Sequence, residues 1–455
     1  MIKSTKMDSK TNKIPRFAFR KEYFGGLLLD FQNTIYELLT SQEFRFLEKL
    51  IAGNKFFLQD LKDSKLKEFI EKLRQKNIIK VDPRGELLID DIRKIPPPEE
   101  IPNEYLSAPL KAYDTYTRKC NLACRHCYAS ANPNLIEKRR TISQTKTIMK
   151  KFYEVGVLEW NFTGGEPTII TDLLKAIKIA VSFGMKVSLN TNGCWNSKIS
   201  NIILESGVKE FIISLDGREK THDNKRDSGT FKRVIKTLDQ IYKYNQNNFN
   251  NKLKVILNMT AGKDNIRDIE YVTYLGVKYG YDVKFVPLKP AGRAFKNFIL
   301  STRDYKEFAK KVQQLRENPK IKDSGINIFL NHKDLFNSQY PDRSNLPYPF
   351  NYSQCTALTT AMDILPDGRV VACSFLMDKP EFIGPNILDV SLYDAWRHPK
   401  MERFRRAQRQ GCINCKFYMK RCRGVCRATV LLSGGKIQGK KLTGNDPYCF
   451  KDLLS

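Results

Sequence analysis

Three cysteines lie within eight residues of one another, at Cys120, Cys124 and Cys127. Thiolates are ligands of iron–sulfur clusters and of structural zinc, so a group this compact predicts a metal centre. A [4Fe–4S] cluster held by three thiolates leaves one iron open to a small molecule. A structural zinc ion would need a fourth protein ligand nearby, and His126, inside the motif, is poorly placed to supply it. We therefore favour an iron–sulfur cluster with one open iron.

The other cysteines gather near the end of the chain. Of 11 cysteines in 455 residues, seven follow residue 354. They are Cys355, Cys373, Cys412, Cys415, Cys422, Cys426 and Cys449. A zinc ribbon could use the four between 412 and 426, but it would leave the other three unexplained. This part of the chain therefore predicts a small lobe held together by metal centres.

Strands and helices alternate between about 110 and 300. The strands are expected in EWNFTGGEP, KVSLNTNG, EFIISLDG, LKVILNMT and DVKFVPLKP, and TDLLKAIKIAVSFG is one of the helices between them. This repeat predicts a parallel sheet, either open or closed into a barrel. Residues that do chemistry should lie at the C-terminal ends of its strands.

Residues 17–90 predict a small α+β unit. Two short strands flank Gly25 and Gly26, TIYELL gives a third strand, and Thr40 with Glu43 forms a capping box for a helix. A second helix carries apolar residues at i, i+3, i+4 and i+7, which are Leu66, Phe69, Ile70 and Leu73. NIIKVDPRGELLI predicts a strand–turn–strand wing, and the proline-rich IPPPEEIP that follows marks a domain boundary.

The chain carries 78 Lys and Arg residues against 49 Asp and Glu residues, a formal net charge of +29. This charge suits nucleic acid, an anionic membrane surface or an acidic peptide as a partner. The basic clusters are short, such as RFRRAQRQ at 403–410, which favours solvated faces instead. No apolar run reaches the length of a membrane span, and the first residues carry no apolar stretch. We expect a cytoplasmic protein that binds neither membrane nor nucleic acid, in which cysteines serve as ligands rather than as disulfides.

The spacing Cys120-x3-Cys124-x2-Cys127 resembles the cluster motif of the radical S-adenosylmethionine (SAM) superfamily. The resemblance implies an α/β fold, a partial (β/α)6 barrel over roughly 113–295. It also implies that the open iron binds the amino and carboxylate groups of SAM. In that family an electron from the cluster cleaves SAM to a 5′-deoxyadenosyl radical, which abstracts hydrogen from the substrate.

Further segments resemble the SAM-binding segments of the same superfamily. NFTGGEP matches its GGEP motif, whose glycines allow a close approach of the backbone and whose Glu166 is expected to accept a hydrogen bond from the SAM ammonium. SLNTNG, ISLDG and PAGRA match later strand ends. The implied SAM contacts are Tyr128, Gly164, Gly165, Glu166, Asn190, Ser214, Asp216 and Arg226, the last as partner of the SAM carboxylate. An ordinary turn residue is the alternative for the last four, and no catalytic base is predicted. Cys194 is expected to be a small buried residue, or else a hydrogen-atom donor.

The seven late cysteines resemble the SPASM domain, which carries two auxiliary [4Fe–4S] clusters; three clusters are thus implied in all. By this resemblance Cys412, Cys415, Cys422 and Cys449 hold the outer cluster, and Cys355, Cys373 and Cys426 hold the inner one. An eighth cysteine found in some members is missing. The inner cluster therefore has a free iron, an aspartate ligand (Asp363 or Asp367) or a ligand from the substrate. We expect an open iron that accepts a substrate thiol or an electron.

The N-terminal unit resembles the winged helix-turn-helix-like element with which ribosomal-peptide maturases bind a leader peptide. There the leader adds a strand to the sheet edge. A DNA-binding wing and a packing domain are the alternatives. The expected organisation is a recognition domain at 1–94, a linker at 95–112, the barrel at 113–300, a helical connection at 301–350 and the SPASM domain at 351–455.

Together these patterns predict an enzyme that abstracts hydrogen from a residue of a ribosomally made precursor peptide. The product would be a thioether or carbon–carbon crosslink, or another oxidative modification. The implied partners are the leader-bearing peptide and an electron donor such as flavodoxin or ferredoxin. Formylglycine formation in a sulfatase and maturation of a haem or quinone cofactor are alternatives. A basic iron–sulfur protein that binds nucleic acid is an alternative of another class, and the intact GGEP motif counts against it.

Overall fold

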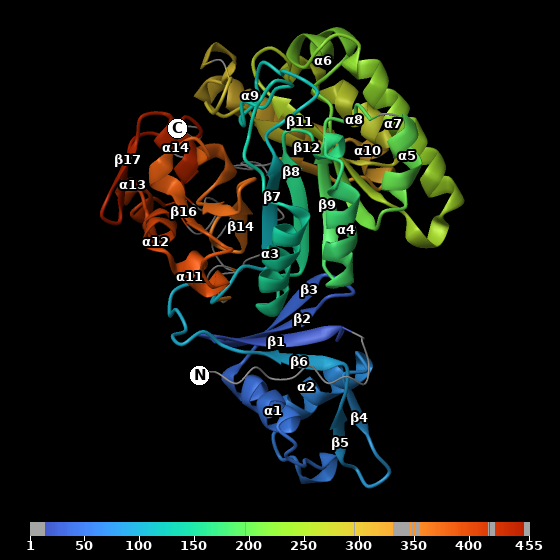
Figure 1. Ribbon diagram of the computed structural model, residues 1–455, viewed down its shortest axis with the longest axis vertical. Coiled ribbons are helices and arrows are strands. Elements are labelled where there is room, and N and C mark those ends of the chain that lie inside the picture. Colours follow the sequence, from blue (N-terminus) through green and yellow to red (C-terminus); the bar gives the residue numbers. More distant parts are fainter. Residues whose placement is uncertain are drawn as a thin grey trace.

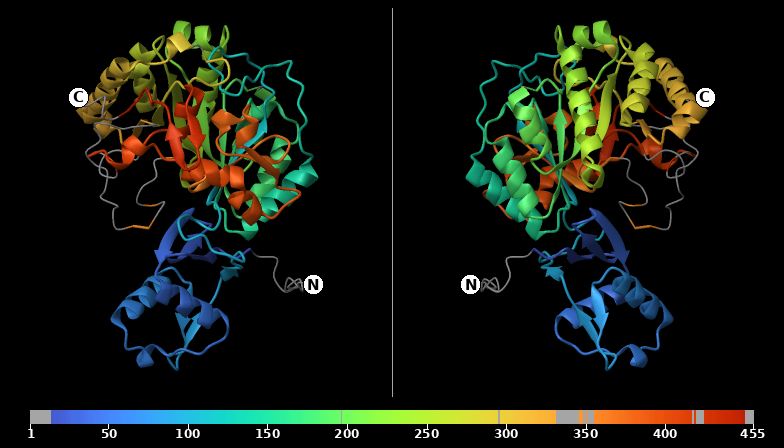
Figure 2. Two further views of the ribbon diagram at one scale, coloured as in Figure 1. Left: turned by 90° about the vertical axis from the view of Figure 1, so that its left-hand side faces the viewer. Right: turned by 90° about the vertical axis from the view of Figure 1, so that its right-hand side faces the viewer.

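The computed structural model describes residues 14–195, 197–294, 296–330, 346–347, 350, 355–416, 418 and 424–449. A small N-terminal unit lies at one end of the long axis, below a larger body (Figure 1). In that body the barrel strands and the C-terminal part lie side by side, as two further views also show (Figure 2). No helix in the described ranges is long and apolar enough to cross a membrane.

The N-terminal unit contains the elements that its sequence predicts. They are β1 (Phe17–Glu22), β2 (Gly25–Asp30), β3 (Ile35–Leu39), α1 (Ser41–Ile51), α2 (Ser64–Gln75), and the hairpin β4 (Ile79–Val81) and β5 (Leu87–Ile89). The capping box is formed, since Thr40 accepts a hydrogen bond from the Glu43 N–H and the Glu43 side chain accepts one from the Thr40 N–H. The buried faces of both helices pack on the three-stranded meander.

A sixth strand, β6 (Ile92–Ile95), was not predicted. It pairs in parallel with β1, so the sheet order is β3-β2-β1-β6. The buried Arg20 of β1 donates to the carbonyl oxygens of Ala108 (2.9 Å) and Val155 (2.7 Å) and pairs with Glu22 (2.8 Å). A buried charge is tolerated only when it is paired and hydrogen-bonded. These contacts therefore fix the N-terminal unit against the base of the barrel.

Six parallel strands form the barrel, as predicted. They are β7 (Lys111–Thr117), β8 (Glu159–Gly164), β9 (Lys186–Thr191), β10 (Val208–Ser214), β11 (Lys254–Ala261) and β12 (Asp282–Pro287), adjacent in chain order. The helices between them are α3 (Ile142–Glu154), α4 (Leu173–Ser182), α5 (Ser197–Leu204), α6 (Glu219–Lys225), α7 (Thr230–Asn247) and α8 (Ile269–Tyr279). Since all six strands run the same way, the loops after them meet at one end of the barrel.

The sheet does not stop at the barrel. After α9 (Thr302–Glu317) and α10 (Pro319–Asp323), β13 (Ile328–Leu330) pairs with β12, while β14 (Ala361–Ile364) pairs in parallel with β7. β15 (Arg369–Val371) and β16 (Ile383–Asn386) continue from β14 in antiparallel pairing. The cysteine-rich part is thus joined to the barrel by a ten-stranded sheet, and Tyr128 of the loop after β7 packs against Phe375, two residues after Cys373, with ring centroids 5.0 Å apart.

The rest of the C-terminal part consists of short elements. They are α11 (Leu392–Arg397), α12 (Pro399–Arg406), α13 (Gln410–Ile413), α14 (Arg427–Leu432), and the hairpin β17 (Lys436–Gln438) and β18 (Lys441–Thr443). The basic segment 403–410 is not a uniformly solvated face. Arg405 is buried, donates to the carbonyl oxygens of Leu358 (2.7 Å) and Trp396 (2.8 Å), and lies over the Tyr105 ring. Its guanidinium therefore serves packing and not the binding of an external polyanion.

Candidate active site

One cavity of ≈ 900 Å³ opens at the C-terminal ends of the barrel strands and extends into the cysteine-rich part. Its cysteines are Cys120, Cys124 and Cys127 from the loop after β7, and Cys355, Cys373, Cys412 and Cys426 from the C-terminal part. The volume is at the upper end of the range for ligand pockets. It has room for a nucleotide-sized ligand together with part of a second molecule.

The first three cysteines are buried or partly buried, and backbone donors point at their sulfur atoms. The N–H of Leu122 donates to Sγ of Cys120, and the N–H of Ala131 donates to Sγ of Cys127, each at 3.4 Å. Burial and the nearby Glu166 carboxylate raise the pKa of Cys120 to about 12. Bound metal would hold such thiols as thiolates, which the two N–H groups would then stabilise. Three soft donors supported in this way fit a cluster ligated on three of its irons.

Arg293 holds the loop that carries these cysteines. Its guanidinium donates to the carbonyl oxygens of Cys124 (3.0 Å) and Ala131 (2.6 Å), and its N–H donates to the carbonyl of Cys127 (3.0 Å). The sequence marked PAGRA only as a strand end. An arginine directly after a glycine turn at such an end is the signal that could have revealed this contact.

Six of the eight predicted SAM contacts line the cavity. They are Tyr128, Gly164, Gly165, Asn190, Ser214 and Arg226. Glu166 is fully buried and lines no part of the cavity. Its carboxylate accepts hydrogen bonds from the N–H of Asn192 (2.7 Å) and the hydroxyl of Thr191 (2.9 Å), and also from Thr168. Protein donors thus contact both oxygens, and the contact of Glu166 with the SAM ammonium stays a prediction.

Asp216 is the other predicted contact that lies outside the cavity. Its buried carboxylate accepts from Nε of Arg226 (2.7 Å) and from the N–H of Thr260 (2.9 Å), and Nε2 of His126 lies 3.3 Å from it. Burial lowers the pKa of His126 to about 3, so its ring is neutral and Nε2 acts as a donor. Asp216 therefore orients Arg226 and the cluster loop. His126 lies against Asp216 and also lines the cavity beside the three cysteines.

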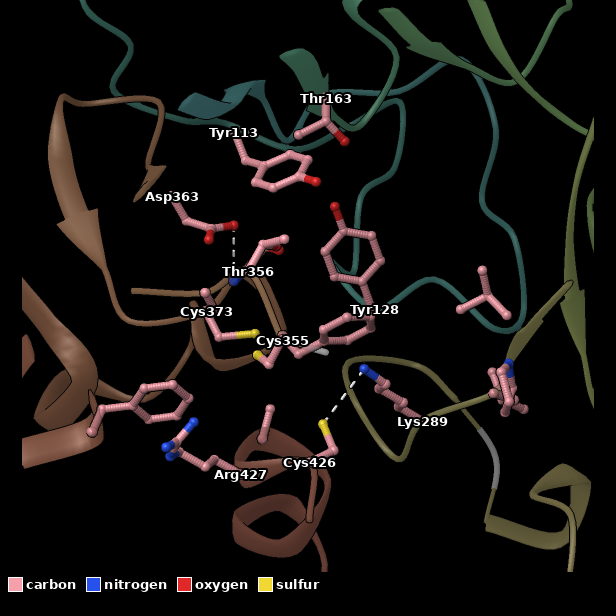
Figure 3. A pocket seen from close by; sticks show the side chains of 18 of the residues that line it. Tyr113, Tyr128, Thr163, Lys289, Cys355, Thr356, Asp363, Cys373, Cys426 and Arg427 are labelled. Atoms are coloured by element: carbon pink, nitrogen blue, oxygen red, sulfur yellow. Dashed lines mark hydrogen bonds between the residues drawn. The ribbon is translucent and has the colours of Figure 1, made fainter. Parts of the chain in front are cut away.

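Three cysteines of the C-terminal part face a common space (Figure 3). Cys355 and Cys373 approach it from one side, and Cys426 with Lys289 from the other. The Nζ atom of Lys289 lies 3.6 Å from Sγ of Cys426. Although burial opposes ionisation, the Lys289 charge lowers the pKa of Cys426 below its ordinary value. A cationic neighbour of this kind suits an anionic cluster.

Of the two aspartates considered for the inner cluster, only Asp363 lines the cavity. It is buried near Cys373 and accepts a hydrogen bond from the N–H of Ser374 at 3.2 Å (Figure 3). Burial raises its pKa to about 6. Asp367 pairs instead with Arg369 at 2.6 Å, outside the cavity.

The residues expected to hold the outer cluster are described in part. Arg409 connects two of them, since its carbonyl accepts from the N–H of Cys412 (2.8 Å) and its guanidinium lies 4.0 Å from Sγ of Cys449. The N–H of Cys415 donates to the carbonyl of Cys412 at 3.0 Å. Cys422 lies outside the described residues.

Two parts of the chain match known protein families. Residues 115–273 match the radical SAM superfamily, and residues 355–422 match the SPASM iron–sulfur cluster-binding domain. The chain is a radical SAM–SPASM enzyme. SAM and [4Fe–4S] clusters are accordingly its cofactors, as predicted from the cysteine motifs.

This radical SAM–SPASM enzyme is similar to several curated proteins. It is 26% identical over 352 residues to the mycofactocin maturase MftC of Mycolicibacterium smegmatis. This alignment covers 76% of this chain and 83% of MftC. It is 28% identical over 290 residues to the sporulation killing factor maturation protein SkfB of Bacillus subtilis, covering 63% of this chain and 64% of SkfB.

A solved structure shares the fold of the radical SAM–SPASM enzyme over nearly its whole length. Streptococcus suis SuiB bound to the precursor peptide SuiA superposes with a TM-score of 0.63. The superposition covers 92% of this chain and 95% of SuiB, at 18% identity. The likeness shows a common fold that includes both the barrel and the SPASM part.

Gly292 is a position where the packing of the cluster loop can be tested. Its φ is +57°, and a Cβ atom would lie 2.3 Å from the carbonyl oxygen of Cys127. Gly292→Ala is expected to displace the loop and to reduce iron content and SAM cleavage, the latter by about 10- to 100-fold. Gly439→Ala is the matched control, because Gly439 has the same φ of +57° with nothing within 4 Å. Equal rates of 5′-deoxyadenosine formation in both variants would contradict this interpretation.

Lys289 is expected to set the redox potential of the inner cluster. Lys289→Met removes the charge beside Cys426, so the reduction potential of that cluster should become more negative. Lys289→Arg keeps the charge and should shift the potential less. An EPR redox titration measures both, with Lys440→Met, an exposed lysine lining the same cavity, as the control. An unchanged potential in Lys289→Met would show that the charge is compensated elsewhere.

Proposed function

We propose that this enzyme modifies a ribosomally made precursor peptide by abstracting hydrogen from one of its residues. One observation carries the proposal: a single cavity reaches from Cys120, Cys124 and Cys127 to the inner cysteines Cys355, Cys373 and Cys426. A substrate residue seated in it would lie between the site of radical formation and an electron acceptor. The maturase names of MftC and SkfB, and the SuiA peptide bound to SuiB, support a peptide as the substrate.

The residues of the chain then have separate roles. The cluster on Cys120, Cys124 and Cys127 together with SAM supplies the 5′-deoxyadenosyl radical. The backbone of Gly164 and Gly165 would admit SAM closely, and Asn190, Ser214, Arg226 and Tyr128, which line the same cavity, would contact it. Glu166 and Asp216 have a positioning role. Their carboxylates accept hydrogen bonds from Asn192 and Arg226 and so order the loops that carry the SAM contacts.

The SPASM cysteines are assigned to two auxiliary clusters. Cys355, Cys373 and Cys426 hold the inner cluster, and Cys412, Cys415, Cys422 and Cys449 hold the outer one. The inner cluster has an open iron that accepts a substrate thiol or an electron, with Asp363 as the alternative fourth ligand. Mössbauer or pulsed EPR spectra of Asp363→Ala distinguish the two: an unchanged inner-cluster spectrum favours the open iron, and an altered one favours the aspartate.

The N-terminal unit is proposed as a winged helix-turn-helix-like element that binds the leader of the peptide. Two helices, a short hairpin and a meander support this assignment. β3 is an edge strand of the sheet and exposes Ile35 (44%) and Tyr36 (42%). An extended peptide can add a strand to such an edge and place apolar side chains on such residues.

Leader recognition gives a specific prediction. Tyr36→Ala should raise the KM for the full precursor about tenfold, a loss of about 1.4 kcal/mol, and should change little for a leaderless peptide. Leu88→Ala is the control, since Leu88 is similarly exposed (47%) on β5. The rate of peptide mass change is measured by mass spectrometry. Equal turnover of full and leaderless peptides by the unaltered enzyme would refute the recognition role.

The proposed function is tested by incubating the anaerobically reconstituted enzyme with SAM, a reductant and a candidate precursor peptide that carries a leader. 5′-Deoxyadenosine should appear together with a peptide lighter by two hydrogens if a crosslink forms. We propose that flavodoxin or ferredoxin supplies the electrons in the cytoplasm, where thiol ligands stay reduced. SAM cleavage without any change in peptide mass would count against a peptide substrate.

A further inference from the structure

A row of polar side chains crosses three neighbouring strands inside the barrel. Ser214 of β10 pairs in register with Asn258 of β11, and Asn258 pairs with Lys284 of β12. All three line the cavity. Parallel strands lie about 4.8 Å apart, so the backbone of Lys284 is roughly 10 Å from that of Ser214. If Ser214 contacts SAM, Lys284 lies two strands away from that contact in the same cavity.

Lys284 differs from the other lysines of the barrel strands. Lys111, Lys186 and Lys254, each the first residue of its strand, pair with acidic side chains, as in the Lys186–Glu210 pair at 3.0 Å, and Lys209 donates to Asn251. In the described part of the chain no ion pair or hydrogen bond engages the Lys284 ammonium. Glu210, the acidic group that acts on it electrostatically, is already bound by Lys186 and Lys254.

The cavity around Lys284 is lined by more basic than acidic side chains. Its lining has eight basic side chains and two acidic ones, Glu104 and Asp363. The basic ones are Arg226, Lys284, Lys289, Arg405, Arg406, Arg409, Arg427 and Lys440. Several are already engaged: Arg226 binds Asp216, Lys289 lies against Cys426, and Arg427 donates to the Ala407 carbonyl (2.8 Å). Lys284 is partly buried, and among the described residues its ammonium has no partner, so it is available to bind a ligand.

A substrate that fills this cavity must satisfy the Lys284 ammonium. Burial and the charges of Lys111 and Lys289 lower its pKa, which shows that the amine is already short of solvent and of negative charge. A ligand that displaced the remaining water without an acceptor would leave a buried polar group unpaired, which is costly. A carboxylate supplies both charge and acceptors in one group.

We propose that Lys284 binds a carboxylate of the substrate residue that is modified, and so determines substrate specificity. The carboxylate belongs either to an acidic side chain or to the C-terminus of the peptide. The proposal rests on the proposed function, because it places a peptide in the cavity. The carboxylate of SAM is assigned to Arg226, which lies near Cys124 and two strands away from Lys284.

The test uses reconstituted holoenzyme with SAM and measures probe binding by calorimetry. One arm compares N-acetylglutamate N-methylamide with the corresponding glutamine compound. The other compares N-acetylalanine with N-acetylalanine N-methylamide. Each pair differs only by a carboxylate against a neutral amide. The proteins are the unaltered enzyme, Lys284→Met, Lys284→Arg and the control Lys440→Met, with iron content and melting temperature recorded for each.

The unaltered enzyme is expected to bind one carboxylate probe at least tenfold more tightly than its amide, about 1.4 kcal/mol. The arm that shows this preference identifies the source of the carboxylate. The preference should disappear in Lys284→Met and persist in Lys284→Arg and Lys440→Met. Equal affinities within both pairs would overturn the proposal, even if Lys284→Met failed to fold.

Two other results would also overturn it. A preference that survives in Lys284→Met would place the carboxylate elsewhere, and a tenfold loss of SAM affinity in that variant would assign the amine to SAM. The experiments distinguish a failure of this proposal from a failure of the proposed function. An enzyme that alters no peptide can still prefer the carboxylate probe, whereas peptide modification without that preference would refute the role of Lys284 alone.

Discussion

Cys124→Ala is expected to abolish SAM cleavage. Cys124 is buried, lines the cavity, and belongs to the three-thiol group that holds the SAM-binding cluster. The two remaining thiols are too few to bind the cluster stably, so the variant lacks the cluster that donates an electron to SAM. Formation of 5′-deoxyadenosine, followed by liquid chromatography after dithionite reduction, should fall to the background rate. Cys120→Ala and Cys127→Ala should behave in the same way.

Cys194→Ala is the matched control for this experiment. Cys194 is also buried, but it lies outside the cavity, and its sulfur is near the carbonyl oxygens of Asn192 and Thr230. Its replacement should leave SAM cleavage within about twofold of the unaltered rate, with a loss of stability on the order of 1 kcal/mol. Substantial cleavage by Cys124→Ala, or an equal loss in Cys194→Ala, would show that the first three cysteines have no special role.

The second large effect is expected at the inner cluster. Cys373→Ala removes one of the three ligands proposed for that cluster, and Cys373 lies outside the loop after β7. Peptide product should therefore fall much more than 5′-deoxyadenosine, and the ratio of 5′-deoxyadenosine to product should rise about tenfold or more. Both quantities come from one anaerobic reaction analysed by mass spectrometry. An unchanged ratio would mean that the inner cluster takes no part after hydrogen abstraction.

The features that could be predicted from sequence are local ones. The capping box at Thr40 and Glu43 depends on residues three apart, and the barrel strands are short apolar runs that end in Gly, Asn or Pro. The cysteine spacing identified the superfamily because few other sites need three thiolates in so short a segment. Each of these patterns depends on residues within one turn or one strand, so it can be recognised in a single sequence.

The features that were missed depend on contacts between distant segments. β14 has only four residues and pairs with β7 about 250 positions earlier, so nothing near it in sequence indicates that the two parts share a sheet. The basic segment at 403–410 looked solvated because its arginines are close together. Arg405 is nevertheless buried, since carbonyl oxygens and two aromatic rings from elsewhere surround it.

In the candidate site, too, the sequence predicted positions along the chain but not contacts between distant segments. Glu166 and Asp216 lie at the expected strand ends, yet neither lines the cavity, because donors from neighbouring loops occupy their carboxylates. Lys284, which faces the cavity, belongs to no motif, and PAGRA indicated a strand end without showing that Arg293 holds the cluster loop. Their positions follow from the register of β12 and the turn after it.

The central claim is that Cys120, Cys124 and Cys127 hold a [4Fe–4S] cluster with one iron free to bind SAM. Electron–nuclear double resonance on the reduced enzyme tests it most directly, with SAM isotopically labelled in its amino and carboxylate groups. The account predicts hyperfine coupling from both labelled groups in the unaltered enzyme and its loss in Cys124→Ala. Zinc in place of iron at this site, or a cluster spectrum that SAM leaves unchanged, would contradict the account.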